Sequence, residues 1–454
     1  MASALDWLTA DREVLLDSVG RQVIVRGMVV LTSRHVMRRY EPRPASADAA
    51  VQPEAMPMCE HDYDRMQAWG LNGQVIRVES GAVGAFPGTQ ADPNYLERLD
   101  QLMSWARERG MYTVFKMTFY DIPESSALGG DRPAFSPAWW AMLFKNEEGA
   151  LEKLADGWDT LGRRYADEPA VLGYDLINEP YNPFAGHLGE VDFAKTYLMP
   201  AYAHLIGRLR TVAPRQLYLI QPRIASAGVK LDFSEFSLER EGLVYAPHQY
   251  PRFWVCTPPS MRRQALVDFQ ATARSLGVPL WIGEWGDMFP ESQSGINGVE
   301  ALWGAACRDQ VEQLDEFGLG WARPWYEWVG AWSTMYNPSS ERTYLTDHIA
   351  RPFPTRTAGG GATFSFDPDR RIFRLHAHFA GGGSTEISLP ARYYSSGFSA
   401  WLGTSRLDVP AGDGGAEEVH GGLRLSWDEK RRRLSVSTER DLDGQLTVSG
   451  VARS

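Results

Sequence analysis

The stretch VLGYDLINEP, residues 171–180, joins a short apolar run to the polar sequence Asn178-Glu179-Pro180. A run of this length and composition is typical of a buried strand, and the proline after it ends the strand and restricts the next loop. If the strand belongs to a parallel barrel, Asn178 and Glu179 lie at its carboxyl end, where barrel enzymes build their active sites. The alternative is that Glu179 is a helix N-cap or an ordinary loop carboxylate.

A second stretch, PLWIGEWG at residues 279–286, repeats this arrangement. A short apolar strand ends in Glu284, and the flanking glycines Gly283 and Gly286 permit tight turns of the backbone. Paired glutamates at the mouth of one barrel suit cleavage of glycosidic bonds. Retention of configuration needs a carboxyl separation of ~5–5.5 Å and inversion ~6.5–9.5 Å. The sequence leaves both outcomes open.

Strand-like apolar runs alternate with helical patterns from the start of the chain to about Pro352. The strand candidates are residues 23–31, 75–79, 112–119, 171–177, 217–221, 243–246, 279–283 and 319–325. Residues 95–109, 262–275 and 298–317 carry apolar side chains at helical spacing. Eight such strand–helix units in about 350 residues predict a (β/α)8 TIM barrel. The rival, a doubly wound open sheet, is disfavoured because no GxGxxG motif follows the first strand.

The pattern changes after the segment Arg351-Pro352-Phe353-Pro354. Short alternating runs follow, separated by glycine-rich turns, and no helical pattern is visible. They are residues 363–366, 371–379, 385–389, 397–402, 423–427, 433–438 and 445–448. Such runs predict an all-β sandwich. We therefore predict an α/β catalytic barrel over residues 1–352, followed by a C-terminal β-sandwich domain over residues 353–454.

The chain is acidic, because 46 Lys and Arg against 57 Asp and Glu give a net charge of −11. A protein that binds nucleic acid usually has the opposite balance or a basic stripe. The dense basic run KRRR, residues 430–433, stands before an alternating strand and is interpreted as a solvated hairpin turn. No nucleic-acid partner is therefore expected.

The cysteines Cys59, Cys256 and Cys307 form no CxxC motif, so neither a zinc site nor a disulfide scaffold is predicted. No run of 18 apolar residues occurs, and no integral membrane segment is expected. Residues 1–10 include Asp6 and no basic segment before an apolar stretch, so no signal peptide is predicted. We expect a cytoplasmic protein, or a secreted one if a leader has been removed.

The polar residues at the strand ends resemble those of glycoside hydrolase family 5, a retaining family built on (β/α)8 barrels. The resemblance rests on Arg77, Asn178-Glu179-Pro180, His248, Tyr250, Glu284 and Trp325. Within the family, the chain most resembles the endoglycoceramidase and glucosylceramidase-like branch. Supporting stretches are LFKNE (143–147), YAPHQY (245–250), RPFP (351–354), FSFDP (364–368) and TEISLP (385–390). The last three resemble the β-sandwich that follows the barrel in that branch.

The resemblance implies a role for each of these residues. Glu179 is implied as the acid/base, which must be protonated when substrate binds, and Glu284 as the nucleophile that forms a glycosyl-enzyme intermediate. Asn178 would hydrogen-bond the sugar 2-hydroxyl. Arg77 would hold Glu284 ionised, with an ordinary strand-end ion pair as the alternative.

Three further residues complete the implied site. Tyr250 would donate a hydrogen bond to Glu284. His248 would orient the acid/base or contact the sugar, and the alternative is a structural histidine. Trp325 would stack on the sugar, although Trp321 and Trp328 are close enough in the sequence to leave the register open.

One segment departs from the pattern of the branch. After the third strand the branch usually has an Asp-Met-His-Gln-Asp-like run, whereas this chain has KMTFYD at residues 116–121. Thr118 stands where the branch has a histidine that shapes the glycone subsite, so the sugar preference stays open. Lys116 is interpreted as a different polar contact near the strand end.

The leading hypothesis is a retaining β-glycosidase that releases glucose or an oligosaccharide from an apolar aglycone, such as that of a glycosphingolipid, by two-glutamate double displacement. The alternatives are a retaining endo-β-glycanase acting on a soluble glucan or mannan, and a non-catalytic carbohydrate-binding barrel. The mechanism requires no metal and no cofactor, because two carboxyl groups and water suffice. The expected partner is a carbohydrate or glycolipid substrate, and the oligomeric state is left open.

Overall fold

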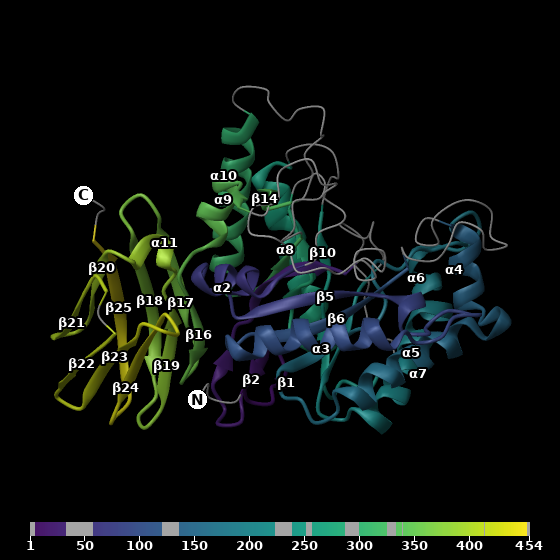
Figure 1. Ribbon diagram of the computed structural model, residues 1–454, viewed down its shortest axis with the longest axis horizontal. Coiled ribbons are helices and arrows are strands. Elements are labelled where there is room, and N and C mark those ends of the chain that lie inside the picture. Colours follow the sequence, from purple (N-terminus) through teal and green to yellow (C-terminus); the bar gives the residue numbers. More distant parts are fainter. Residues whose placement is uncertain are drawn as a thin grey trace.

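Eight parallel strands form a barrel in the computed structural model (Figure 1). The structure describes residues 5–32, 58–119, 136–222, 238–250, 257–286, 299–324, 333–337, 339–412 and 414–451. The barrel strands are β4 (Arg26–Leu31), β5 (Gly73–Glu79), β6 (Tyr112–Thr118), β7 (Val171–Asp175), β8 (Leu217–Ile220), β9 (Leu243–Tyr245), β11 (Trp281–Ile282) and β13 (Gly320–Arg323). They pair in the order β11-β13-β4-β5-β6-β7-β8-β9, and a parallel bridge from Tyr245 to Leu280 joins the two ends. The predicted barrel is confirmed.

Helices on the outside of the barrel connect these strands. They are α2 (Glu60–Ala68), α3 (Pro93–Glu108), α4 (Pro137–Phe144), α5 (Ala150–Arg164), α6 (Glu190–Phe193), α7 (Met199–Val212), α8 (Pro259–Leu276), α9 (Val299–Glu316) and α10 (Thr343–Ile349). Short 3-10 or π turns lie at η2 (Ser80–Ala82), η4 (Glu147–Gly149) and η5 (Ala194–Leu198). The three helices predicted from apolar spacing correspond to α3, α8 and α9. Within the described ranges, no helix is long and apolar enough to span a bilayer.

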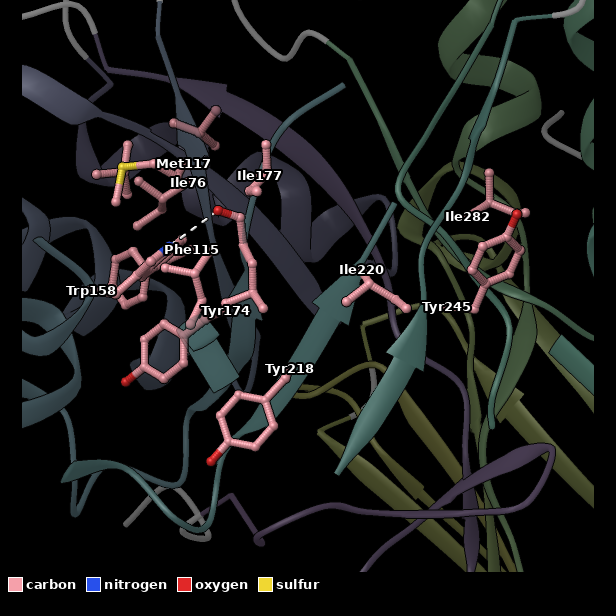
Figure 2. Close-up of a cluster of buried hydrophobic side chains, with 14 of the residues drawn as sticks. Ile76, Phe115, Met117, Trp158, Tyr174, Ile177, Tyr218, Ile220, Tyr245 and Ile282 are labelled. Atoms are coloured by element: carbon pink, nitrogen blue, oxygen red, sulfur yellow. Dashed lines mark hydrogen bonds between the residues drawn. The ribbon is translucent and has the colours of Figure 1, made fainter. Parts of the chain in front are cut away.

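Two apolar layers hold the barrel together, because successive residues of a strand point to opposite faces. One layer packs between the strands and the helices. Figure 2 shows part of it, including Phe115, Tyr174 and Trp158, whose indole Nε1 donates a hydrogen bond to the carbonyl of Leu176 at 3.1 Å. The other layer forms a separate buried cluster that includes Val29, Val75, Val114, Leu219 and Val244. Because of the same alternation, the polar side chains at the strand ends point toward the barrel mouth.

The first strand begins later than predicted. Residues Gln22–Val23 form β3, which pairs with β16 (Phe353–Thr357) rather than with the barrel. Two further strands belong to the same sheet: β2 (Val14–Leu16) pairs with β3, and β1 (Thr9–Asp11) pairs with β2. Local sequence cannot show this, because the partner strand lies more than 300 residues away. The sheet beside the barrel is therefore built from both ends of the chain.

Two antiparallel sheets form the C-terminal sandwich, beside the barrel in Figure 1. One sheet has the order β1-β2-β3-β16-β19-β24-β23-β22, and the other β17-β18-β25-β20-β21. The strands not yet given are β17 (Thr363–Asp367), β18 (Ile372–Phe379), β19 (Ser384–Ser388), β20 (Gly397–Leu402), β21 (Ser405–Pro410), β22 (Gly415–His420), β23 (Leu423–Asp428), β24 (Arg433–Thr438) and β25 (Leu442–Gly450). The predicted sandwich is confirmed, with β16, β21 and β22 as C-terminal strands that the sequence pattern missed.

Two local expectations in this region need correction. A one-turn helix, α11 (Ala391–Tyr394), follows β19, although no helix was visible in the pattern. The basic run does form the turn between β23 and β24, but Arg432 is buried rather than solvated. Its guanidinium donates to the Leu389 carbonyl at 2.9 Å and to Glu429 at 2.7 Å, so the charge is used within the fold.

A buried charge cluster joins the barrel to the sandwich. Asp315 of α9 forms ion pairs of 2.8 Å with Arg26 of β4 and with Arg351, which precedes β16. The Arg26 guanidinium also lies 4.6 Å from the ring centroid of Phe353. Burial penalises the charged form of Arg26 and lowers its pKa, although Asp315 acts in the opposite direction. Because unpaired buried charges are expensive, this cluster couples the stability of the two parts.

Candidate active site

A short two-stranded extension carries one glutamate at the barrel mouth. β10 (His248–Gln249) follows β9, β12 (Glu284–Trp285) follows β11, and the two pair in parallel with His248 opposite Glu284. Gly283 separates β11 from β12. A Cβ atom at this position would lie 2.9 Å from the Ala246 carbonyl oxygen and 3.1 Å from His248 Cδ2. A glycine at this position therefore lets the histidine approach Glu284.

Glu179 has a backbone conformation that is uncommon for its residue type. Its φ angle is 49°, in the left-handed region, although a residue before proline normally adopts an extended conformation. Its amide donates a hydrogen bond of 2.9 Å to Gln221 Oε1 at the end of β8. Strained backbone of this kind persists where surrounding contacts hold it, and it is frequent at functional sites.

Four of the residues that the resemblance implied lie together. His248 Nδ1 is 2.9 Å from Glu179 Oε1 and 3.7 Å from Glu284 Oε2. The Tyr250 hydroxyl donates a hydrogen bond of 2.8 Å to Glu284 Oε2. Burial and the negative charges of Glu284 and Glu179 raise the pKa of Tyr250 well above its ordinary value, so the phenol stays protonated as a donor.

The cation paired with Glu284 is Lys116 rather than Arg77. Lys116 of β6 is fully buried, and its ammonium forms an ion pair with Glu284 Oε1. Arg77 is its register partner on β5, and no ion pair between Arg77 and Glu284 occurs in the described part of the chain. The sequence pattern could not rank the two cations, because both lie on neighbouring strands with the same inward parity.

Glu284 is held in its ionised form. Burial would raise the pKa of its carboxyl group, but the charges of Lys116 and His248 and the hydrogen bonds from Lys116 and Tyr250 outweigh burial and lower it. An ionised carboxylate can attack an electrophilic carbon, which a protonated one cannot. A metal ion would compete with Lys116 for Oε1, so these groups suit acid/base and nucleophilic chemistry better than metal binding.

Two buried polar residues behind the glutamates were missed from the sequence. Gln221 Nε2 donates hydrogen bonds of 2.8 and 2.7 Å to the carboxylate oxygens of Asp175, at the end of β7. Asp175 is the register partner of Lys116. Burial raises the pKa of Asp175 to about 7, against the opposing effect of Lys116. The available signal was a polar residue at the carboxyl end of a buried strand, since charged groups are rarely buried without partners.

The remaining implied residues have different outcomes. Asn178 is buried, and its Oδ1 has no hydrogen-bond partner among the residues described, which leaves it available to a ligand. Thr118 is also buried, but its hydroxyl donates to the Val78 carbonyl at 2.9 Å. This hydrogen bond ties β6 to β5. Trp325 lies outside the described residues.

The chain is similar to several known proteins. Residues 53–322 match the family described as Cellulase (glycosyl hydrolase family 5). Endoglycoceramidase I of Rhodococcus hoagii (strain 103S) is 22% identical over 447 residues, which cover 88% of this chain and 82% of that protein. Probable glucan 1,3-beta-glucosidase A of Aspergillus niger (strain ATCC MYA-4892 / CBS 513.88 / FGSC A1513) is 24% identical over 251 residues, or 53% of this chain and 54% of that protein.

Solved structures share the complete architecture. Endo-glycoceramidase II from Rhodococcus sp., in a complex with a cellobiose-like imidazole, has a TM-score of 0.70 at 23% identity, covering 97% of this chain and 100% of that chain. Sterylglucosidase 1 of Cryptococcus neoformans has a TM-score of 0.69 at 12% identity, covering 98% and 97%. At these identities the structural similarity concerns the fold. The family match extends over more than half of the sequence, and the chain belongs to glycosyl hydrolase family 5.

Proposed function

We propose that this glycoside hydrolase is a retaining β-glycosidase that releases glucose or an oligosaccharide from an apolar aglycone, with a glycosphingolipid or similar glycolipid as substrate. Glu179 is the acid/base and Glu284 the nucleophile. The observation that carries the proposal is the closeness of the two carboxyl groups. One carboxylate oxygen of Glu179, one of Glu284 and a ring nitrogen of His248 all lie within 4.8 Å of one another. This spacing supports retention, since inversion needs ~6.5–9.5 Å to admit water between the carboxyl groups.

In the first step Glu284 attacks the anomeric carbon while the glycosidic bond to the aglycone breaks. Glu179 gives its proton to the departing oxygen, and a covalent ester between the sugar and Glu284 remains. Tyr250 and Lys116 each hold one oxygen of Glu284, so that the attacking group is oriented before substrate arrives. In the second step Glu179 takes a proton from water, the water oxygen attacks the anomeric carbon, and Glu284 departs as a carboxylate.

Asn178 and His248 are assigned to substrate binding and positioning. The free Oδ1 of Asn178 supports a hydrogen bond to a sugar hydroxyl next to the anomeric carbon. His248 contacts Glu179 through Nδ1, which supports a role in orienting the acid/base. Arg77 and Trp325 are retained as proposed sugar contacts. Arg77 no longer has the role of counter-ion to Glu284.

The choice of a glycolipid substrate is supported by the relatives. The relative named endoglycoceramidase matches 88% of the chain, whereas the relative named as a glucosidase of glucan matches 53%. The test is hydrolysis of a panel that contains an aryl β-glucoside, an aryl β-lactoside, glucosylceramide, a longer glycosphingolipid, a steryl glucoside and a soluble β-glucan. Activity confined to the lipid-linked sugars is expected, with the β-anomer of the sugar as the first product by NMR.

The control variants separate chemistry from binding. Glu284→Gln should bind substrate and hydrolyse none of the panel. Glu284→Gly should regain activity on an aryl glycoside with added azide, because a small anion fills the position of the lost carboxylate. Cleavage of the glucan alone would replace this proposal by the endo-β-glycanase alternative. Binding that both Glu179→Gln and Glu284→Gln leave intact, without hydrolysis by the wild type, would indicate a non-catalytic carbohydrate-binding barrel.

A further inference from the structure

We propose that Lys116 is a positioning residue that keeps Glu284 a good leaving group as well as an ionised nucleophile, with Asp175 as its second counter-ion. The inference rests on the proposed function, because it assigns Lys116 a part in both halves of the double displacement. Lys116 stands in KMTFYD, the segment that departs from the pattern of the branch that the chain resembles.

Because Lys116 is buried, its charge must be stabilised by the protein groups around it. The side chain is fully buried, and Glu284, with a side chain 6% exposed, is its ion-pair partner. An ammonium group in such a place is stable only when it is paired and hydrogen-bonded. The ion pair crosses the barrel mouth from β6 to β12, so Lys116 fixes the position of Glu284 Oε1 as Tyr250 fixes that of Oε2.

Other charged groups surround this pair. Asp175 of β7 is the register partner of Lys116 and attracts its charge, and Gln221 donates to both oxygens of Asp175. His248 of β10 lies between the two glutamates. Arg77 of β5 is the register partner of Lys116 on the opposite side.

The charge of Lys116 has different partners at different stages of the reaction. In the free enzyme its ammonium is balanced by the Glu284 carboxylate. When Glu284 becomes an ester it carries no charge and no longer opposes the ionisation of Asp175, whose ionised form the charge of Lys116 favours. When water displaces the ester, the carboxylate of Glu284 forms again next to the ammonium group of Lys116. Lys116 therefore lowers the barrier to the second step, because it stabilises the group that departs.

The experiment compares wild type, Lys116→Met, Lys116→Arg and the control Lys153→Met on an aryl β-glycoside hydrolysed by the wild type. Lys153 lies on the outer surface of α5, where 44% of its side chain is exposed. Its substitution therefore makes the same change of charge at a solvent-exposed position. In Lys116→Met the acidic limb of kcat/KM should move to higher pH by about 1–3 units, because an opposite charge beside the carboxyl is lost.

A second readout distinguishes this role from a structural one. Without Lys116 the ester is displaced more slowly, so kcat and KM should fall together, kcat by about tenfold or more. A burst of the aryl leaving group should appear in the first turnover as the intermediate accumulates. Lys116→Arg should restore both the pH limb and the steady state in part, and Lys153→Met should match wild type. A folded Lys116→Met protein with an unchanged acidic limb and no burst would overturn the proposal.

A double variant and an NMR titration test the role of Lys116 if the first experiment fails. If Lys116→Met fails to fold, the double variant Lys116→Met/Asp175→Asn keeps the net charge of the site and is expected to show the same burst. A ¹³C-carboxyl NMR titration, with the Glu284 signal assigned through Glu284→Gln, measures the pKa of Glu284 without turnover. An upward change in that pKa in Lys116→Met supports the role even if no glycoside of the panel is cleaved, in which case the proposed function fails separately. No change in that pKa contradicts the role whatever the enzyme cleaves.

Discussion

Gln221 binds Asp175 through both carboxylate oxygens, with Nε2 at 2.8 and 2.7 Å from them. Oε1 of the same side chain accepts a hydrogen bond of 2.9 Å from the backbone amide of Glu179. One buried amide thus links the counter-ion side of the site to the acid/base, across the ends of two adjacent barrel strands. The geometry of Glu179 therefore depends on a residue that need not touch substrate.

Replacing Gln221 tests this link. Gln221→Met keeps the approximate volume but removes both hydrogen-bond functions, so the strained backbone at Glu179 should relax away from its position. We expect kcat/KM to fall by about tenfold, or ~1.4 kcal/mol of transition-state stabilisation, with the loss largest for poor leaving groups. Steady-state kinetics on aryl glycosides of graded leaving-group pKa measures this. An equal loss of kcat/KM on every substrate would contradict a specific effect of Gln221 on Glu179.

The acid role of Glu179 predicts a dependence on the leaving group. Glu179→Ala should lower kcat/KM at least ~100-fold for lipid or alkyl glycosides, which need protonation of the departing oxygen. Activated aryl glycosides should be affected far less in their first step. The measurement is the slope of log kcat/KM against leaving-group pKa for the wild type and the variant. Parallel slopes would remove Glu179 from the acid role.

Asp175 predicts a dependence of stability on pH. Its pKa is about 7 in the folded protein and ~3.9 in an unfolded chain. The folded state therefore binds the proton more tightly, and the stability that Asp175 contributes is complete below about pH 4 and is lost as pH rises to about 7. Asp175→Asn does not titrate, so its stability relative to wild type should rise over this window by up to ~1.4 kcal/mol per pH unit.

Urea unfolding at several pH values measures this difference. Asp268→Asn, on the surface of α8, serves as the matched control because it makes the same chemical change outside the barrel mouth. Its difference from wild type should vary little across the window. A difference for Asp175→Asn that stays constant between pH 4 and 7 would contradict the prediction.

The junction between barrel and sandwich predicts a loss of global stability. Asp315→Asn removes the charge that faces both Arg26 and Arg351 and leaves two buried guanidinium groups without it. The free energy of unfolding should fall by about 3–5 kcal/mol. Glu316→Gln is the control on the same helix, since Glu316 pairs with Arg263 on the surface, where an ion pair contributes little to stability. Similar midpoints of thermal unfolding for both variants would show that the junction contributes little.

Much of the architecture and half of the site follow from local patterns. Apolar runs and helical spacing locate all eight barrel strands, and the polar ends of two of them identify Glu179 and Glu284 as candidates. That His248 lies near Glu284 is also predictable in outline, because His248 follows β9 and Glu284 follows β11, the next barrel strand along the chain. These features are predictable because alternation and strand length depend on neighbouring residues along the chain.

Other features depend on contacts between distant segments. Lys116 and Glu284 are 168 residues apart. The register makes Arg77 and Lys116 neighbours on β5 and β6, so only the contact with Glu284 in three dimensions ranks Lys116 above Arg77. Likewise, Gln22–Val23 joins β16 instead of the barrel, because hydrogen bonds to a strand from the other end of the chain complete its edge. Such choices are made by the three-dimensional distance between charges and backbone groups, which no local pattern contains.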